Sequence, residues 1–185
     1  MRPKKNEEYV VVLDFLANGY VNDKSPAHLK TPIAQSIGTE NFTLLELVPR
    51  KGVNLQLLEK VYVGEGKREK IHHINGKLYF DKLTSTAESE LEYALLDMIK
   101  EQEQRFVEFF NNAPSLNTRV HLLELLPGLG KKHMLQVIEK RKEEKFKSFK
   151  DIKDRVRLMA DPEKLLVKRI IQELKGKEKH YIFVR

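Results

Sequence analysis

A tight turn between two apolar segments constrains the fold of this chain more than any other feature. Residues 119–138 place Pro127-Gly128-Leu129-Gly130 between two runs rich in Leu, Met, Val and Ile. This pattern predicts two helices that the turn reverses against each other. The glycines allow positive φ angles, and without side chains they let an anion approach the backbone N–H groups. Lys131 and Lys132 follow where the second helix begins, and the helix dipole favours an anion there as well.

The segment resembles the helix-hairpin-helix family of nonspecific nucleic-acid-binding motifs. In that family an apolar pair precedes Pro-Gly-Ile-Gly, and a small residue and an apolar residue follow at fixed spacing. The matching positions here are Leu125, Leu126, Pro127 to Gly130, Met134 and Val137, with Met134 where the family usually has Ala. The resemblance implies contact with a phosphodiester backbone, and the residues that it assigns to this contact are Pro127, Gly128, Leu129, Gly130, Lys131 and Lys132.

A second hairpin of the same kind is incomplete in this sequence. Phe146 to Val156 is similar to the connecting helix of a double-hairpin fold, but no Gly-x-Gly follows it. Arg157 to Ala160 lead instead to Asp161 and Pro162, which predict the N-cap and first position of another helix. We therefore expect a degenerate second half that completes the fold, with phosphate bound through the first hairpin alone. No internal repeat is evident in the sequence.

The C-terminal part of the chain carries the excess positive charge. The whole chain has 34 Lys and Arg against 27 Asp and Glu, a net charge of +7, which favours an anionic partner. Residues 1–113 have 15 basic and 17 acidic residues, whereas residues 114–185 have 19 and 10. We expect Lys140, Arg141, Lys168 and Arg169 to assist the hairpin in attracting phosphate.

The first 83 residues are typical of short antiparallel strands. Tyr9–Leu16, Phe42–Val48 and Lys60–Val63 are rich in β-branched and apolar residues, and Asn75-Gly76 predicts a tight hairpin turn between two further strands. We expect a small β-barrel of the oligonucleotide-binding (OB) type over residues 1–84. Tyr62 and Tyr79 are candidates for stacking on bases, although a role in the core explains them equally well.

A long helix is expected next, over residues 85–113, as a connection to an all-α helix-hairpin-helix domain at residues 114–185. Ser85 and Glu88 have the spacing of a capping box, and apolar residues from Leu91 to Phe109 recur mostly every three or four positions. The chain after Ser115 is expected to be helical as far as Gly176, with a short terminal strand at Tyr181–Val184. The predicted fold class is therefore α+β.

Several classes of function are excluded by composition and motifs. The chain has no cysteine, which excludes thiolate metal sites and cysteine nucleophiles and fits a reducing cytoplasm. No apolar stretch near the N-terminus has the length of a membrane span, so no membrane partner is expected. His72 and His73 are adjacent, so in a regular strand they would point to opposite faces and could not share a metal ion. We find no catalytic constellation and expect neither an enzyme nor a cofactor.

Over most of its length the sequence resembles an archaeal family of uncharacterised proteins that is described as predicted to bind nucleic acid, often RNA. Val63–Arg68, Leu83–Ala87 and Arg105–Ala113 carry this resemblance together with the hairpin. We expect nonspecific nucleic-acid binding, with RNA slightly favoured over DNA. The alternatives are a protein-interaction module of the transcription or translation machinery and, less favoured, an unrecognised nuclease or lyase.

Overall fold

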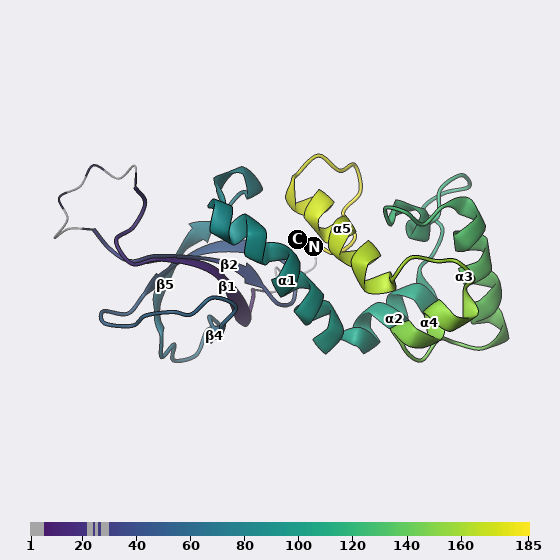
Figure 1. The fold of residues 1–185 in the computed structure, drawn as a ribbon, viewed down its shortest axis with the longest axis horizontal. Coiled ribbons are helices and arrows are strands. Elements are labelled where there is room, and N and C mark those ends of the chain that lie inside the picture. The colour runs from purple at the N-terminus through teal and green to yellow at the C-terminus, as the bar shows by residue number, and fades with distance from the viewer. Residues whose placement is uncertain (1–5, 22–23, 25, 27–29) are drawn as a thin grey trace. The chain divides into compact units, whose positions relative to one another are not determined.

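The chain is a mixed α+β protein that forms two compact units. The computed structural model describes residues 6–21, 24, 26 and 30–185 (Figure 1). We call Met1–Ala94 together with Glu173–Arg185 the sheet unit, and Leu95–Gln172 the helical unit. This division differs from the predicted boundaries at residues 84 and 113. The C-terminal segment belongs with the strands, and the expected connecting helix is shared between the two units.

The sheet unit contains one curled antiparallel sheet with the strand order β4-β1-β2-β3-β5 (Figure 1). The strands are β1 (Tyr9–Leu16), β2 (Ile33–Gly38), β3 (Leu44–Pro49), β4 (Lys60–Tyr62) and β5 (Ile71–Lys77). Three of the five predicted strands, those matching β1, β3 and β4, are confirmed to within two residues at each end. β2 was not predicted, and the strand expected at Lys77–Leu83 does not form. Within the described part of the chain, β4 pairs only with β1 and β5 only with β3, so the sheet is a half-barrel.

Asn75-Gly76 does not form the predicted hairpin turn. The pair lies inside β5, and Gly76 is opposite Glu46 while Ile74 is opposite Leu47. Asn75 is therefore an extra residue in the ladder, and its side-chain amide donates to the Glu46 carboxylate. Because a turn preference is local and weak compared with the hydrogen bonds of a whole strand, pairing with β3 decides the outcome.

Two buried polar residues of the sheet position the start of helix α1 (Ser85–Glu101). The Asp14 carboxylate accepts the Thr84 hydroxyl at 2.6 Å, and the Gln35 side-chain oxygen accepts the Thr84 N–H at 2.8 Å. Thr84 Oγ1 in turn accepts the N–H of Ala87 at 3.1 Å. Thr84 therefore caps the helix, and the predicted capping box of Ser85 and Glu88 is wrong by one residue.

The predicted long helix is two helices. It is interrupted at Gln102, whose φ of −105° and ψ of 28° leave the helical region, and α2 (Glu103–Asn112) begins at the next residue. The Glu103 carboxylate accepts the N–H of Phe149 at 2.7 Å, so the first residue of α2 is bonded to the first residue of α4. The remaining elements are η2 (Phe80–Lys82), η3 (Leu122–Leu125), α3 (Lys131–Glu143), α4 (Phe149–Arg155) and α5 (Pro162–Leu174).

The C-terminal segment is held by a carboxylate, and the predicted strand at Tyr181–Val184 does not form. Glu173 is 1% exposed and accepts three successive N–H groups, those of Ile182 at 2.8 Å and of Phe183 and Val184 at 2.9 Å. These donors are therefore paired without a neighbouring strand. Arg185 N–H then reaches the carbonyl of Asn41 at 3.2 Å, which attaches the end of the chain to the β2–β3 turn.

Candidate functional site

The hairpin segment begins with a short 3₁₀ helix rather than with the predicted apolar α-helix. His121 caps η3, because its Nδ1 accepts the N–H of Leu123 at 3.1 Å while the Glu124 carboxylate accepts the N–H of His121 at 2.8 Å. Burial lowers the pKa of His121, and Arg141 lowers it further, while Glu124 opposes both effects. The neutral imidazole is thus the form that this cap requires.

The turn itself, Leu126–Gly130, has buried anchors and exposed glycines. Leu126 and Leu129 are buried, and the N–H of Leu129 reaches the carbonyl of Leu126 at 3.0 Å. Gly128 has a φ of +96°, a conformation that L side chains rarely adopt. A Cβ atom on Gly128 would lie 3.3 Å from a methyl group of Leu165. The turn therefore requires glycine at this position, as predicted.

Gly130 serves a different purpose from the one expected. Its φ of −71° and ψ of 168° suit any residue, so the turn does not need a positive φ there. A Cβ atom on Gly130 would meet nothing within 4 Å. Because Gly130 is the N-cap of α3 and is exposed, the absence of its side chain leaves the start of the helix open to solvent.

Three backbone donors converge at this open helix start. The N–H groups of Gly130, Lys131 and Lys132 precede Met134, whose N–H is the first to donate within the helix, to the carbonyl of Gly130 at 3.0 Å, and Gly130 provides no side-chain cap. Across the residues that the structure describes, these three groups have no hydrogen-bond partner. The site is thus an exposed set of unpaired donors at the positive end of a helix, an arrangement that suits an oxyanion.

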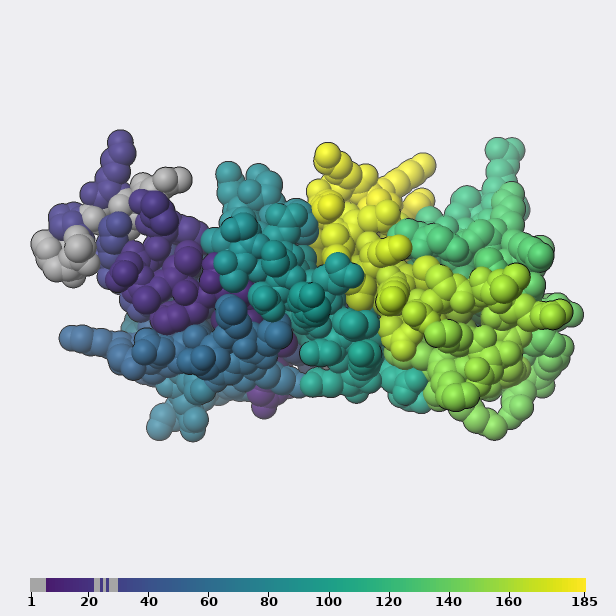
Figure 2. All heavy atoms as spheres, viewed as in Figure 1, coloured from purple at the N-terminus to yellow at the C-terminus, as the bar shows by residue number. Residues whose placement is uncertain are grey.

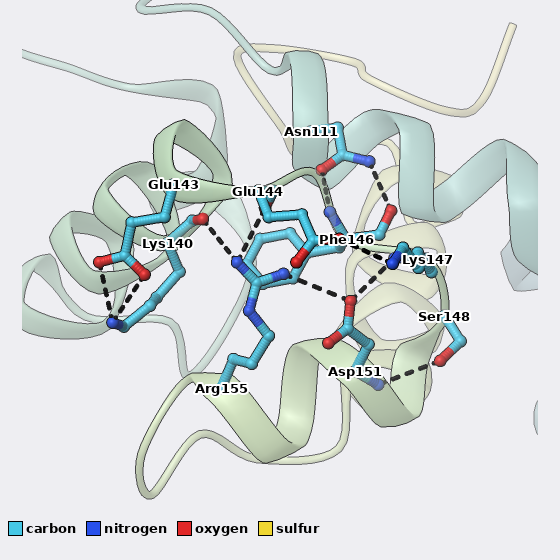
Figure 3. A network of polar contacts seen from close by, with 9 residues as sticks. All are labelled: Asn111, Lys140, Glu143, Glu144, Phe146, Lys147, Ser148, Asp151 and Arg155. Carbon is cyan, nitrogen blue, oxygen red and sulfur yellow. Dashed lines mark hydrogen bonds and ion pairs between the residues drawn. The ribbon is translucent and has the colours of Figure 1, made fainter.

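The predicted cations divide into exposed and structural residues. Lys131, Lys132 and Lys168 are exposed and have no ion-pair partner in the described part of the chain. Lys140 pairs with Glu143, with both carboxylate oxygens 3.0 Å from its Nζ (Figure 3). That pairing leaves less of its charge available to a ligand than at the three unpaired lysines.

Two predicted phosphate contacts are corrected by the structure. Arg169 is only 3% exposed, and its guanidinium donates to the carbonyl of Leu125 at 3.2 Å, just before the turn. Arg141 donates to the carbonyls of Phe110 and Ala113, each at 3.0 Å, and burial lowers its pKa. Because both guanidinium groups satisfy carbonyls at the ends of helical segments, they position the hairpin rather than contact a ligand.

A polar network that sequence reasoning missed holds α2, α3 and α4 together (Figure 3). Arg155 donates to the carbonyls of Lys140 at 2.7 Å and Glu144 at 2.8 Å, and it stacks over the Phe146 ring at 4.7 Å. Buried Asn111 exchanges two hydrogen bonds with the backbone of Phe146, at 2.8 and 2.9 Å. Nothing in the local pattern marks Asn111 or Arg155, because their partners are backbone groups far along the chain.

Most of the charged residues that follow α3 form ion pairs with one another. Lys147 pairs with Glu144 at 2.7 Å, Lys150 with Asp154 at 2.5 Å, and Arg155 with Asp151 at 3.3 Å. The light green residues that follow α3 occupy much of the visible face of the helical unit in Figure 2, below an area of darker green residues. This surface is therefore a mixed one in which neighbouring acids offset most of the basic residues.

Comparison with known proteins places the chain in a family. Residues 6–185 match the family described as "Protein of unknown function (DUF655)". The chain belongs to this family. It is 44% identical over 186 residues to the uncharacterized protein MJ0038 of Methanocaldococcus jannaschii, across 100% of this chain and 82% of the relative. The predicted resemblance to an archaeal family of uncharacterised proteins is confirmed.

A solved structure of the DUF655 family has the same fold. The crystal structure of Af1531 from Archaeoglobus fulgidus is similar to this chain with a TM-score of 0.92 and 45% sequence identity. The match covers 97% of this chain and 100% of the other. The α+β architecture with a curled five-stranded sheet is therefore shared with Af1531.

In the sheet unit of this DUF655 protein, the two tyrosine candidates differ. Tyr62 packs edge-to-face on Tyr9 with ring centroids 5.3 Å apart, and its hydroxyl accepts the N–H of Gly66 at 3.1 Å. A Cβ atom on Gly64 would lie 2.5 Å from that hydroxyl, so the Tyr62 ring organises the β4–β5 loop. Tyr79 is 69% exposed, so its ring lies largely at the surface.

The adjacent histidines do not point apart as predicted. The β3–β5 register shifts between Val48 and Pro49, which are opposite His73 and Ile71, so His72 is an extra residue in the ladder. The two Nδ1 atoms consequently lie 2.7 Å apart. Across the described ranges, no group of three or more His, Cys, Asp or Glu side chains could hold a metal ion. None of the described helices is both long and apolar enough to span a membrane.

Proposed function

We propose that the helical unit binds the phosphodiester backbone of a nucleic acid without sequence specificity, through a helix-hairpin-helix formed by η3, the Leu126–Gly130 turn and α3. The observation that carries this proposal is the open start of α3. The unpaired N–H groups of Gly130, Lys131 and Lys132 lie beside two exposed, unpaired ammonium groups. Backbone donors fix a phosphate in place, and the lysines attract it.

The chemistry of the site favours phosphate over a base. Every donor at the turn is a backbone N–H or an ammonium, and these groups carry no pattern that distinguishes one base from another. The hydrogen bonds are charge-assisted at the phosphate, which strengthens them. Binding should therefore depend strongly on salt and weakly on base sequence.

A variant at Gly130 tests the proposal directly. Gly130→Val is compatible with the backbone, since φ is negative and the space around a Cβ is empty, but the branched side chain covers the donors. We expect about tenfold weaker binding to RNA and DNA duplexes, measured by fluorescence anisotropy, because a charge-assisted hydrogen bond is lost. Thr86→Val, at an exposed position of α1, is the control, because it places the same branched side chain away from the turn.

The same titration separates the alternative functions. Equal affinities of the wild-type protein and Gly130→Val would contradict the proposal and favour a hairpin that contacts a protein of the transcription or translation machinery. Incubation of labelled RNA and DNA with the protein, with and without magnesium, tests for a nuclease, which would release shorter products. We expect no cleavage, since the described residues show no cluster suited to a metal ion.

We also propose that the sheet is a partly open barrel of the OB type and that RNA is slightly favoured over DNA. In the strand order β4-β1-β2-β3-β5, strands β4 and β5 form the two edges of the sheet and are not paired with each other. Barrels of this kind use loops and an open sheet face to bind oligonucleotides. The strand order carries this proposal, because a groove of about 1,020 Å³ in this unit is lined by four glutamates as well as by Arg68 and Lys77 and does not favour an anion by its charge.

A further inference from the structure

The helical unit contains a second turn with the same local structure as the first. The first turn is Leu126–Gly130, and the second turn is Val156–Ala160. Each starts from a buried apolar residue, and each closes with a hydrogen bond from its fourth residue to its first. The N–H of Leu129 reaches Leu126 at 3.0 Å, and that of Met159 reaches Val156 at 3.5 Å. The backbone thus repeats a geometry that the sequence does not.

The two turns differ at the residue that reverses the chain. Gly128 has a φ of +96°, and its counterpart Leu158 has a φ of +59°. Glycine adopts such angles freely, whereas a bulky side chain is strained there. Leu158 is also 93% exposed, so no packing within the described structure compensates for the strain. An apolar side chain held outward in a strained conformation points to a role in binding.

The second turn cannot bind phosphate as the first does. It leads into α5 through Asp161, whose carbonyl accepts the N–H of Leu165 at 3.2 Å, and through Pro162, which has no N–H. The hydrogen bond and ion pair from Lys153 hold the pKa of Asp161 below its ordinary value, so this carboxylate is charged at neutral pH. A negative charge at the helix start and a missing donor both disfavour a phosphate there.

Contacts with α5 place the two turns near each other. Leu165, whose methyl group lies beside Gly128 of the first turn, is one helical turn after Asp161, which ends the second turn. One turn of an α-helix advances by about 5.4 Å. A nucleic acid whose phosphate is bound at the first turn therefore passes close to the second.

We infer that Leu158 is an apolar wedge that enters a nucleic acid where base stacking is interrupted, beside the phosphate bound at the first turn. The inference rests on the proposed function, because the first turn must hold the backbone for the wedge to reach the bases. Apolar side chains of this size are known to enter base steps and to unstack them. Exposed Arg157 precedes the wedge and adds a cation at its base. The expected ligand is thus a duplex with a bulged or mismatched base.

The test compares duplexes with and without a bulged base, made of RNA and of DNA, by fluorescence anisotropy. We expect the wild-type protein to prefer the bulged duplex by about tenfold, in line with burial of one Leu side chain. Leu158→Gly should lose this preference and keep its affinity for the continuous duplex within about twofold. Leu158→Met should retain the preference, because an apolar side chain of similar size remains.

Leu58→Gly is the matched control. Leu58 also has a left-handed backbone, with a φ of +62°, but it lies in the sheet unit. Leu158→Gly relieves strain and removes a side chain that is 93% exposed, so its melting temperature should not fall by more than about 2 °C, whereas Leu58 is only 39% exposed and its removal also costs packing. Only Leu158→Gly should lose the preference. A 2-aminopurine next to the bulge should brighten when the wild-type protein binds and should not do so with Leu158→Gly.

The outcomes separate this inference from the proposed function. If the wild-type protein binds neither duplex in a salt-dependent way, the proposed function itself fails. If it binds both duplexes equally, or if Leu158→Gly keeps the preference, phosphate binding at the first turn stands and the wedge is refuted. A loss of preference in Leu58→Gly as well would also refute it, since the effect would then not belong to the second turn.

Discussion

At the scale of single residues, several side chains that look like surface groups in the sequence are structural supports for the hairpin. Arg169 and Arg141 donate hydrogen bonds to backbone carbonyls, and His121 caps η3 through its unprotonated Nδ1. These hydrogen bonds stabilise the ends of the helical segments around the turn. A substitution at any of them is therefore expected to lower the stability of the helical unit more than it alters contacts with a ligand.

His121 makes the stability of the helical unit depend on pH. Its pKa in the folded state lies below the ordinary value of 6.5, mainly because of burial. The stability that the neutral cap contributes is therefore present above about pH 6.5 and is lost as the pH falls toward the folded-state pKa. Urea denaturation should show a free energy of unfolding that decreases by at most about 1.4 kcal/mol per pH unit in this window.

A variant isolates the contribution of this histidine. His121→Asn retains an oxygen that can accept the N–H of Leu123 but does not titrate, so the decrease below pH 6.5 should become smaller. An unaltered pH dependence in His121→Asn would show that another group is responsible.

At the scale of secondary-structure elements, tertiary hydrogen bonds decide where helices and strands begin. Thr84 rather than Ser85 caps α1 because Asp14 and Gln35 of the sheet hold its hydroxyl and its N–H. The predicted capping box considered only neighbours in the sequence. The same reason explains why Asn75-Gly76 continues a strand.

The two candidate caps of α1 can be told apart by mutation. Thr84→Ala removes both the cap and the partner of the buried Asp14 carboxylate, so we expect it to lower the free energy of unfolding by about 2 kcal/mol. Ser85→Ala should cost less than about 0.5 kcal/mol, because Ser85 is exposed. Chemical denaturation of both variants measures the difference, and a larger loss for Ser85→Ala would restore the predicted cap.

At the scale of the whole molecule, the net charges of the two structural units differ less than those of residues 1–113 and 114–185. The helical unit has 17 Lys and Arg against 12 Asp and Glu, a net charge of +5, and the sheet unit carries the remaining +2. Several basic side chains of the helical unit form ion pairs with acidic ones, so the net charge overstates the positive charge available to attract a ligand. Unpaired lysines beside the turn should dominate the attraction to phosphate.

Salt dependence of binding measures these contacts. With about four phosphates neutralised, the logarithm of the affinity for a duplex should fall with the logarithm of salt concentration at a slope of roughly −3.6. Lys131→Ala combined with Lys132→Ala should reduce the slope to roughly −1.8, since each contact contributes about −0.9. Lys147→Ala with Lys150→Ala removes two paired lysines and should change it little. Equal changes for both pairs would contradict the role of ion pairing.

The sequence alone was sufficient for features that depend on neighbouring residues. Alternating β-branched residues predicted β1 with its observed bounds, and Pro127 to Gly130 predicted a reversal that needs glycine at Gly128. Local backbone preference is encoded within a few residues, so it can be read without knowledge of the fold. The family resemblance followed from the same short motifs.

Only the tertiary structure decided which groups are exposed, paired or strained. Arg169 and Lys168 are neighbours in the sequence, yet one is buried beneath the hairpin and the other faces solvent. The return of Glu173–Arg185 to the sheet unit and the left-handed backbone of Leu158 are likewise invisible in a local pattern. These properties depend on contacts between residues far apart in the chain, because burial and hydrogen bonding are set by whatever the fold brings alongside each group.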